Sequence, residues 1–588
     1  MWLNPTEPSR SRLAVLIAVL AILPYVNSLP GEFTLDDVEV VRDNPTVSGQ
    51  AASPRLLYAT AYNPDAEVLV PTMTPIGAYW VKYRPVTMLT YWLNARLGES
   101  AIGYHLVNLG LHALVAIAMF YLAYDLLGSA SGATISAALF AVHPIHTEAV
   151  SSIVGRAELL AALAVLVSLL AMVRATTEVE HRTRWLTLSA GALVIGCLAK
   201  ESAFVGIPLC LAAHLWVRRT SALRESLMLM LPGVFVGVAY LGLRALAIGR
   251  LTVPATVIVL DNPLAQVPLA PRLETALAIL WQYLAQLTVP LRLSADYSYN
   301  EIPVVASARD PRFVGAAVLF TGLAIGLMLS RKRAPALALA AAFFAIPLLL
   351  TANMLFPIGT IKAERLLYLP SFGWCLGCAG LIMQIPERQR GRCLTVVALV
   401  VVAFAGRTWV RNWDWQNNFA LFSATVQTSA HSAKAHHNLA VAYTERGDLD
   451  NAMLQFHESL AIYPPYDDAA FGIGKIYERK GIDAGALEWY ATATRLNPNW
   501  APAHLNSGAI YYKRGEFTAA EKAFRAGLES QPNNPRLLIG LALVRLAQDD
   551  RAEAEILIGR ATSLADGDHE VAALLAEARQ AFGQKVTR

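Results

Sequence analysis

Charged residues are scarce in this sequence, and cysteine is nearly absent. Only 16% of the 588 residues are Asp, Glu, Lys or Arg, whereas 55% are hydrophobic. This balance excludes an ordinary soluble protein, and the chain is too long for one domain. The 48 basic residues nearly balance the 44 acidic ones, which argues against binding to nucleic acid. We therefore expect a protein that lies largely in lipid.

All five cysteines lie in apolar runs, which excludes a disulfide framework and a zinc finger. Cys375 and Cys378 have the spacing of a redox motif, but their place inside an apolar segment favours packing. The first apolar run lacks a small-residue cleavage site, so we interpret it as a membrane anchor. The sequence also lacks a C-terminal Lys-Asp-Glu-Leu signal, and we expect a bacterial inner membrane.

The sequence contains eleven apolar segments of about 15 to 24 residues, which suits membrane-spanning helices. They begin near Leu13, Gly103, Ala133, Ile153, Leu186, Ala203, Leu227, Phe313, Pro335, Leu366 and Cys393. A twelfth candidate, residues 273–290, contains Glu274, Gln282 and Gln286, so we interpret it as an interfacial or re-entrant helix. The prediction is an all-α, polytopic membrane domain over residues 1–410.

The charged loops divide between the two sides of the membrane. With eleven spans, the arginine-rich loops at residues 10–12, 174–184, 218–224, 331–333 and 388–392 all fall on the cytoplasmic side. Polar clusters gather on the other face, at residues 36–37, 143–148, 200–201, 296–297 and 362–365. Charged groups near a membrane boundary cost free energy unless they are paired, hydrated or functional, so this clustering predicts one polar site. Ordinary charged loops are the alternative.

The remaining sequence is polar and repeats every 34 residues. The recurring positions are Tyr443, Tyr477 and Tyr511; Gly447, Gly481 and Gly515; Ala452, Ala486 and Ala520; Phe456, Tyr490 and Phe524; and Pro464, Pro498 and Pro532. This is the tetratricopeptide pattern of paired helices. A fourth unit has Arg545 and Asp549 at the tyrosine and glycine positions, which is typical of a weaker terminal repeat.

We predict a linker over residues 411–432, a soluble α-solenoid of four repeats over 433–566, and a capping helix over 567–588. The concave face of such an array commonly binds an extended peptide, and a purely structural spacer is the alternative. An eleven-span count places this array in the same compartment as the polar clusters.

A series of short motifs, in one order, resembles the transmembrane and tetratricopeptide-repeat O-mannosyltransferases over nearly the whole chain. They are FTLDD (33–37), NPTV (44–47), YRPVT (83–87), YHLVN (104–108) with His112, HPIHTEAV (143–150), GRAE (155–158), LAKE (198–201), LSADYSY (293–299) and ERLLYLPS (364–371). Some motifs are weak singly, but together with the repeats they are specific.

The resemblance implies a glycosyltransferase of the GT-C type. It implies transfer of mannose from a polyisoprenyl-phosphate to Ser or Thr hydroxyls of a translocated protein, a catalytic acidic pair in the first loop, and no metal. Asp36 is then the candidate base, and the neighbouring carboxylate of Asp37 can raise its pKa and orient it. The alternative for the pair is a helix cap or a solvated loop. Direct displacement of this kind would invert the anomeric centre.

Four basic side chains are candidates for the donor phosphate, because guanidinium and ammonium groups suit phosphate oxygens: Arg84, Arg365, Lys200 and Arg156. The alternatives are contact with a lipid headgroup and a simple ion pair, such as Lys200 with Glu201 or Arg365 with Glu364. Further candidates around the donor or acceptor are His105, His143, His146, Glu148, Glu201, Asp296, Tyr297 and Glu364. We reject a zinc site at His143 and His146, because Pro144 disfavours the helical spacing and no further ligand is evident.

The expected partners are a polyisoprenyl-phosphate sugar, which serves as co-substrate without any further cofactor, an acceptor protein or peptide on the repeats, and membrane lipids. Two other functions remain open. One is a non-enzymatic membrane scaffold that carries the repeat array. The other keeps the fold but uses another sugar or a cell-envelope glycan as acceptor.

Overall fold

The computed structural model describes residues 9–48, 83–218, 223–248, 257–330, 334–564 and 569–586. In these ranges the chain is helical and contains no strand. The chain divides into two compact units, and the boundary lies between His431 and Ser432. The predicted basic loop at 331–333, most of the loop at 218–224 and the predicted boundary at 566 and 567 lie outside the described residues.

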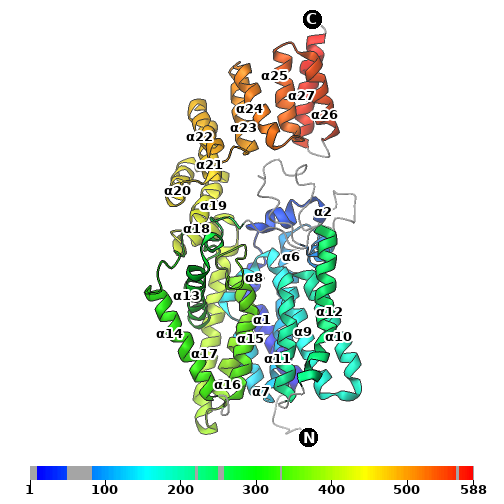
Figure 1. Ribbon diagram of the computed structural model, residues 1–588, viewed down its shortest axis with the longest axis vertical. Helices are drawn as coiled ribbons and strands as arrows, with labels where there is room; N and C mark the ends of the chain where they lie inside the picture. Colours follow the sequence, from blue (N-terminus) through cyan, green and yellow to red (C-terminus); the bar gives the residue numbers. More distant parts are fainter. Residues whose placement is uncertain are drawn as a thin grey trace. The chain divides into compact units, whose positions relative to one another are not determined.

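The first unit is a bundle of helices joined by loops and short turns (Figure 1). Its helices are α1 Arg10–Ile22, α2 Pro45–Ser48, α5 Pro85–Leu97, α6 Ala101–Leu127, α7 Ala130–Ala141, α8 Thr147–Ser151, α9 Arg156–Thr177, α10 Arg182–Ala199, α11 Gly206–Arg218, α12 Leu223–Ile248, α13 Leu269–Thr288, α14 Pro311–Ser330, α15 Pro335–Thr351, α16 Pro370–Met383, α17 Glu387–Asn412 and α18 Asn418–Thr428.

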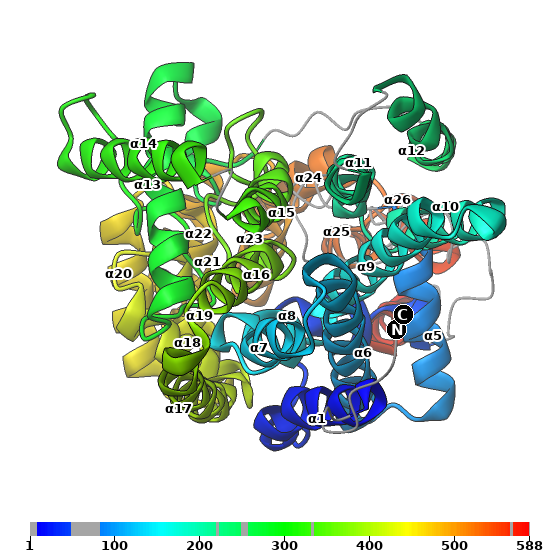
Figure 2. The ribbon, with the colours of Figure 1, turned by 90° about the horizontal axis from the view of Figure 1, so that it is seen from below.

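The centre of this bundle is formed by α6 and α9. Helix α6 packs against α1, α7 and α9, and α9 packs against α10 and α11. Small and aliphatic side chains along them are fully buried, such as Ala116 and Leu122 on α6 and Val165 and Leu169 on α9. Figure 2, an end-on view, places α12, α14 and α17 at the rim. Rim helices that are apolar all round fit a lipid environment.

Helices lie at all eleven positions where the sequence predicts spans. Six described segments are long and apolar enough to cross a membrane: residues 10–28, 101–127, 153–177, 226–247, 311–330 and 387–415. Helices α7, α15 and α16 are apolar but shorter. The membrane character of this unit is thus evident, whereas the total of eleven spans stays a prediction. Helix α13, the predicted interfacial helix, is not among the six.

Helix α17 has one side of exposed apolar residues and one side that packs against the bundle. Leu399 and Val402 are exposed, and two tryptophans, Trp409 near the C-terminal end and Trp413 directly after the helix, expose 42% and 55% of their surface. On the opposite side, the Thr408 hydroxyl donates to the backbone oxygen of Val142 at 2.8 Å. Exposed indoles at the end of an apolar helix are typical of the membrane–water interface.

The predicted linker over 411–432 is structured. Helix α17 continues to Asn412, a single 3₁₀ turn follows at Trp413–Trp415, and α18 occupies Asn418–Thr428. The side chain of Asn417 caps α18 by accepting from the Ala420 N–H at 3.0 Å. Leu421, Phe422 and Thr425 of α18 are buried. This segment therefore belongs to the packed part of the first unit.

The second unit consists of helical hairpins that repeat every 34 residues. Its helices are α19 Ala433–Glu445, α20 Leu449–Ile462, α21 Asp467–Arg479, α22 Asp483–Leu496, α23 Ala501–Lys513, α24 Phe517–Ser530, α25 Pro535–Ala547, α26 Arg551–Ser563 and α27 His569–Val586. Gly447, Gly481 and Gly515 turn the chain within the first three hairpins with φ of 72° to 80°, a conformation that glycine adopts without strain.

The fourth hairpin compensates for its two departures from the repeat pattern. Asp549 takes the left-handed turn with φ of 62°. Arg545, in place of tyrosine, pairs with Glu521 at 2.5 Å and with Glu553 at 2.7 Å. Arg525 bridges the same two carboxylates. These ion pairs connect α24, α25 and α26 where the other repeats use an aromatic side chain.

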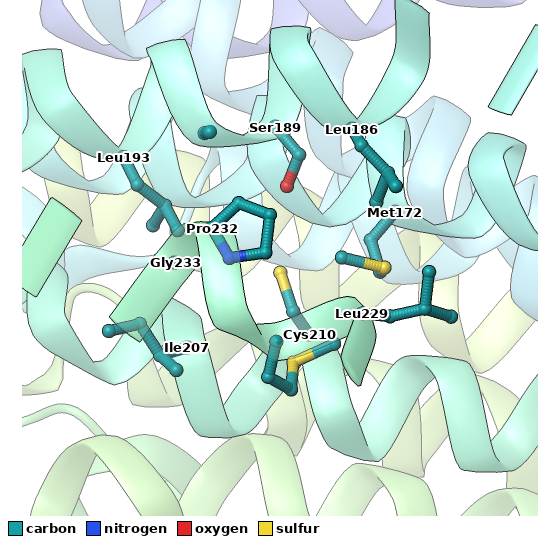
Figure 3. A pocket seen from close by; sticks show the side chains of 11 residues that line it. Met172, Leu186, Ser189, Leu193, Ile207, Cys210, Leu229, Pro232 and Gly233 are labelled. Carbon is teal, nitrogen blue, oxygen red and sulfur yellow. The ribbon is translucent and has the colours of Figure 1, made fainter. Parts of the chain in front are cut away.

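An apolar crevice lies among α9, α10, α11 and α12 (Figure 3). It is lined by side chains such as Met172, Leu193, Ile207 and Cys210, with Pro232 of α12 beside them, and no lining residue is charged. None of the predicted site residues lines it. The chemistry must therefore be sought in the polar loops instead.

Candidate active site

The two adjacent aspartates of the first loop differ in environment. Asp36 is exposed, whereas Asp37 is fully buried. The Asp37 carboxylate accepts from the N–H of Val154 at 2.7 Å, from the N–H of Ile153 at 3.1 Å and from the Ser152 hydroxyl at 3.2 Å. Burial raises the pKa of Asp37 to about 6, although these hydrogen bonds oppose the rise. Asp37 therefore anchors the loop on the turn that leads into α9, while Asp36 stays free for chemistry.

The backbone before Asp36 is strained. Leu35 has φ of 52°, in the left-handed region that a residue with a side chain rarely adopts. Such a conformation costs on the order of 1–3 kcal/mol and persists only where the surroundings hold it. Here the Leu35 N–H donates to the side-chain oxygen of Asn418 at 2.8 Å. The direction in which Asp36 leaves the loop is thus fixed from both sides.

Arg365 and Glu148 form an ion pair that brings two predicted loops together. The Arg365 guanidinium pairs with one Glu148 oxygen, and the Arg365 N–H donates to the other at 2.8 Å. Burial lowers the pKa of Arg365, but Glu148 and, more weakly, Asp36 outweigh it and raise the pKa overall. The Arg365 side chain remains about one third exposed. An exposed carboxylate and a partly exposed guanidinium therefore face the same polar region.

Two more ion pairs lie in the same region. Arg84 forms a two-pronged contact with Glu201 at 2.6 and 3.1 Å, and Lys200 pairs with Glu158. Burial lowers the pKa of Arg84, but Glu201 and, more weakly, Glu158 outweigh it, and the charge of Glu158 also acts on Arg365. Burial lowers the pKa of Lys200. The structure thus brings together three of the four predicted phosphate candidates.

Ion pairing is the alternative that the sequence left open for these cations, but the partners differ from those suggested. Lys200 pairs with Glu158 rather than with Glu201, and Arg365 pairs with Glu148 rather than with Glu364. The reason is geometric, because adjacent residues at a helix start or end project in different directions. Carboxylates from other parts of the chain therefore pair with Lys200 and Arg365.

Arg156, the fourth candidate, is fully buried and occupied. It donates to the side-chain oxygens of Asn108 at 2.9 Å and Asn94 at 3.0 Å, and to the backbone oxygens of Thr90 at 3.2 Å and Tyr104 at 3.0 Å. Its guanidinium also lies 4.8 Å from the ring of Tyr91. All three nitrogens are in use, so the geometry gives Arg156 a structural role at the start of α9.

The two histidines of the HPIH motif are fully buried and hold their loop in place. His143 Nδ1 accepts from the Ile145 N–H at 3.2 Å, so its Nε2 donates to the Leu287 backbone oxygen at 2.9 Å. His146 Nε2 contacts the Ser371 hydroxyl at 2.8 Å. No group of three or more metal-ligating side chains occurs in the ranges that the structure describes. Loop shaping is therefore the role that this geometry supports.

His105 is separate from that pair. Its ring is buried on α6, and neither ring nitrogen has a hydrogen-bond partner among the described residues. Gly31 of the first loop lies close by, since a Cβ atom added there would lie 3.4 Å from His105 Nε2. His105 thus lies beneath the loop that carries the aspartates.

Glu364 lies at the centre of a second buried cluster, together with the predicted Tyr297. Its carboxylate accepts from the Tyr297 hydroxyl at 2.7 Å and from the Ser294 N–H at 2.5 Å. Asp296 is engaged nearby, where it accepts from the Ser298 hydroxyl at 2.6 Å. The cluster ties the 293–299 segment to the residue that precedes Arg365.

Two members of this cluster are not among the predicted site residues, although Lys362 lies in the predicted polar loop at 362–365. Arg411, buried at the end of α17, lies 3.9 Å from Glu364 and 2.8 Å from Asp414. Lys362 is buried, lies 4.2 Å from the centre of the Tyr297 ring and donates to Gln282 at 3.0 Å. Burial lowers the pKa of Lys362 to about 7. The signal for Arg411 was its charge within an aromatic stretch that we had assigned to a linker.

The titration of Glu364 predicts a pH-dependent stability. Burial raises the pKa of Glu364 to about 7, against about 4.3 for an unfolded chain. Between these values the folded state holds a proton that the unfolded state has lost, so stability falls as the pH rises from about 4.3 to 7. Glu364→Gln should remove a loss on the order of 3–4 kcal/mol from this window. The thermal unfolding midpoint of detergent-solubilised protein, followed from pH 4 to 8, measures it.

The exposed Glu180→Gln provides the matched control, because it should leave the pH dependence as in the unchanged protein. An identical pH profile for Glu364→Gln and for the unchanged protein would contradict this prediction.

The geometry so far defines a helical membrane protein with a charge-rich group of loops, followed by an array of helical hairpins. Residues 253–324 match the family described as protein O-mannosyl-transferase TMTC, DUF1736, and residues 511–578 match the tetratricopeptide repeat family. The first match includes α13 and the loop with Ser294 and Tyr297. The resemblance predicted from the motifs is therefore confirmed.

Relatives align over most of this chain. A protein O-mannosyl-transferase of Caenorhabditis elegans is 28% identical over 79% of this chain and 65% of its own length. Human protein O-mannosyl-transferase TMTC3 is 26% identical over 88% of this chain and 60% of its own length. The Drosophila melanogaster Tmtc3 protein, a protein O-mannosyl-transferase, is 27% identical over 95% of this chain and 65% of its own length. The chain thus spans less than two thirds of the length of these relatives, which are animal proteins.

Solved structures resemble parts of the chain. A tetratricopeptide-repeat protein of Thermus thermophilus is 23% identical, covers 32% of this chain and 95% of its own, and has a TM-score of 0.25. The repeat protein YrrB is 18% identical, and the match covers 28% of this chain and 81% of YrrB, with a TM-score of 0.24.

Proposed function

We propose that this chain is a membrane-embedded glycosyltransferase that transfers mannose from a polyisoprenyl-phosphate to Ser or Thr hydroxyls of proteins outside the cytoplasm. The observation that carries the proposal is an exposed Asp36 whose charge acts on the partly exposed Arg365 of another loop. The names of the sequence relatives support the sugar and the protein acceptor. We further propose a GT-C fold with eleven spans, and with the polar loops and the repeats on the extracytoplasmic side.

The difference in burial between Asp36 and Asp37 gives the two carboxylates different roles. Asp36 takes the proton of the acceptor hydroxyl, whose oxygen then forms the bond to the anomeric carbon. The bond between that carbon and the phosphate oxygen breaks, and the phosphate leaves with the electron pair. Attack from the face opposite the phosphate inverts the anomeric centre. Asp37 does not reach the acceptor in this scheme, because its oxygens are occupied by the turn before α9.

The departing phosphate is stabilised by the cations of the site. Arg365 is the first candidate, since it is partly exposed and lies near Asp36, and Arg84 and Lys200 follow. Each already has a carboxylate partner, which keeps the cation oriented before the phosphate arrives. A guanidinium has five N–H donors, so an arginine can hold a carboxylate and a phosphate together. The scheme requires no metal.

Cells with and without this protein should differ in the mass of their secreted and envelope proteins. If the proposal holds, intact mass spectrometry will show a hexose increment on Ser or Thr residues only in cells that contain the protein. Sugar analysis of the modified peptides identifies the hexose and tests mannose against its epimers. Identical masses in both strains would favour the non-enzymatic scaffold, and a hexose found only on a glycan would favour a cell-envelope acceptor.

A further inference from the structure

The loop that carries Asp36 rests on the segment that leads toward the repeats. The Glu32 N–H donates to the backbone oxygen of Gln416 at 2.8 Å, and the Leu35 N–H donates to the side-chain oxygen of Asn418 at 2.8 Å. Gln416 in turn donates from its side chain to the backbone oxygen of Asn27 at 2.8 Å. Two contacts from the first loop and one from the end of the first apolar segment therefore meet residues that precede or open α18.

The contact at Leu35 differs from the others, because it holds a residue in an unfavourable conformation. Leu35 has φ of 52°, and it directly precedes Asp36. A return of Leu35 to negative φ would rotate the following peptide and turn the Asp36 side chain in another direction. Asn418 binds the N–H of Leu35, which lies at one end of the bond about which this rotation occurs.

Asn418 is itself held rigidly. It is the first residue of α18, and the neighbouring Asn417 caps that helix through the Ala420 N–H. Leu421, Phe422 and Thr425 bury one side of α18. At the other end, the Ser429 hydroxyl donates to Ser294 Oγ at 2.7 Å. The side-chain oxygen of Asn418 is thus presented by a fixed element and not by a free loop.

We propose that Asn418 is a positioning residue for Asp36, which it orients by holding the left-handed backbone of Leu35. This inference rests on the proposed role of Asp36 as the base. Asn418 does not touch the substrates in this scheme. Its loss should therefore lower the rate of the chemical step while the binding of donor and acceptor is unaffected.

Asn418→Leu tests this role, because leucine has nearly the same size and no acceptor oxygen. We expect kcat for transfer of mannose from a synthetic polyprenyl-phosphate mannose to a Ser/Thr peptide to fall at least tenfold, with KM for both substrates within twofold. Asn418→Asp keeps an acceptor oxygen and should retain most of kcat. Asn417→Asp is the matched control, since aspartate caps a helix as well as asparagine does. If Asn418→Leu fails to fold, Asn418→Ala carries the same expectation.

A double-mutant cycle separates positioning from a general structural role. Glycine adopts positive φ without strain, so Leu35→Gly removes the need for the restraint. In the Leu35→Gly background, Asn418→Leu should lower kcat less than threefold. Equal losses in both backgrounds, or a fall in thermal stability that accounts for the lost activity, would overturn the proposal.

The outcome also distinguishes this inference from the proposed function. If Asp36→Asn is inactive but Asn418→Leu has normal kcat, only the role of Asn418 is wrong. If Asp36→Asn transfers sugar normally, the proposed function of the site fails, and the positioning role fails with it.

Discussion

Asp36→Asn should abolish sugar transfer, with a fall in kcat of about 10³-fold or more, and leave the fold intact. The amide cannot accept the proton of the acceptor hydroxyl, and general-base catalysis typically contributes about 10²–10⁴-fold. The fold should persist because Asp36 is exposed, whereas Asp37 supplies the anchoring hydrogen bonds. The measurement is transfer of mannose from polyprenyl-phosphate mannose to a peptide by purified protein in detergent.

Asp43→Asn is the control for this experiment. Asp43 is exposed in the same loop and pairs with its neighbour Arg42 at 2.7 Å. We expect unchanged activity for this variant and an unchanged thermal midpoint for both variants. Activity of Asp36→Asn at the level of Asp43→Asn would assign the catalytic base to another residue.

Arg156→Met should destabilise the protein by about 3–5 kcal/mol, because it leaves buried acceptors without donors. The guanidinium serves Asn94, Asn108, Thr90 and Tyr104, and methionine restores none of these hydrogen bonds. The expected result is a large fall in the thermal aggregation midpoint and in the yield of folded protein. The same substitution at the exposed Arg309 should leave both unchanged.

A different outcome is expected if Arg156 binds the donor phosphate instead. Arg156→Met would then fold normally, and the KM for the donor would rise. That result would contradict the structural role and return Arg156 to the site.

Sequence reasoning succeeded where a residue type has one dominant role. The 34-residue spacing predicted the hairpins, and Gly447, Gly481 and Gly515 occupy the left-handed turns that the pattern requires. Apolar runs predicted the helices of the first unit for a similar reason, because length and hydropathy leave few alternatives. Both signals are local in the chain, so they can be read without the fold.

Charged residues were harder to assign, because a sequence does not show which loops meet. Arg84, Arg156 and Arg365 were all candidates for the donor phosphate, but two of them face the polar region and Arg156 is fully enclosed. Asp36 and Asp37 likewise separate by burial alone. Asn418 gave no signal, since its role depends on a contact with a residue 383 positions away.

Two exposed tryptophans, Trp409 in α17 and Trp413 directly after it, mark the depth of the proposed chemistry. Trp409 and Trp413 flank the stretch in which Arg411 approaches Glu364, and the Asn27 side chain of the first loop region donates to the Trp409 backbone oxygen at 2.8 Å. Indoles of this kind settle among lipid headgroups. In the proposed reaction, an amphiphilic donor would therefore keep its hydrocarbon tail immersed while its sugar reaches the carboxylate, without extraction of the whole molecule from the bilayer.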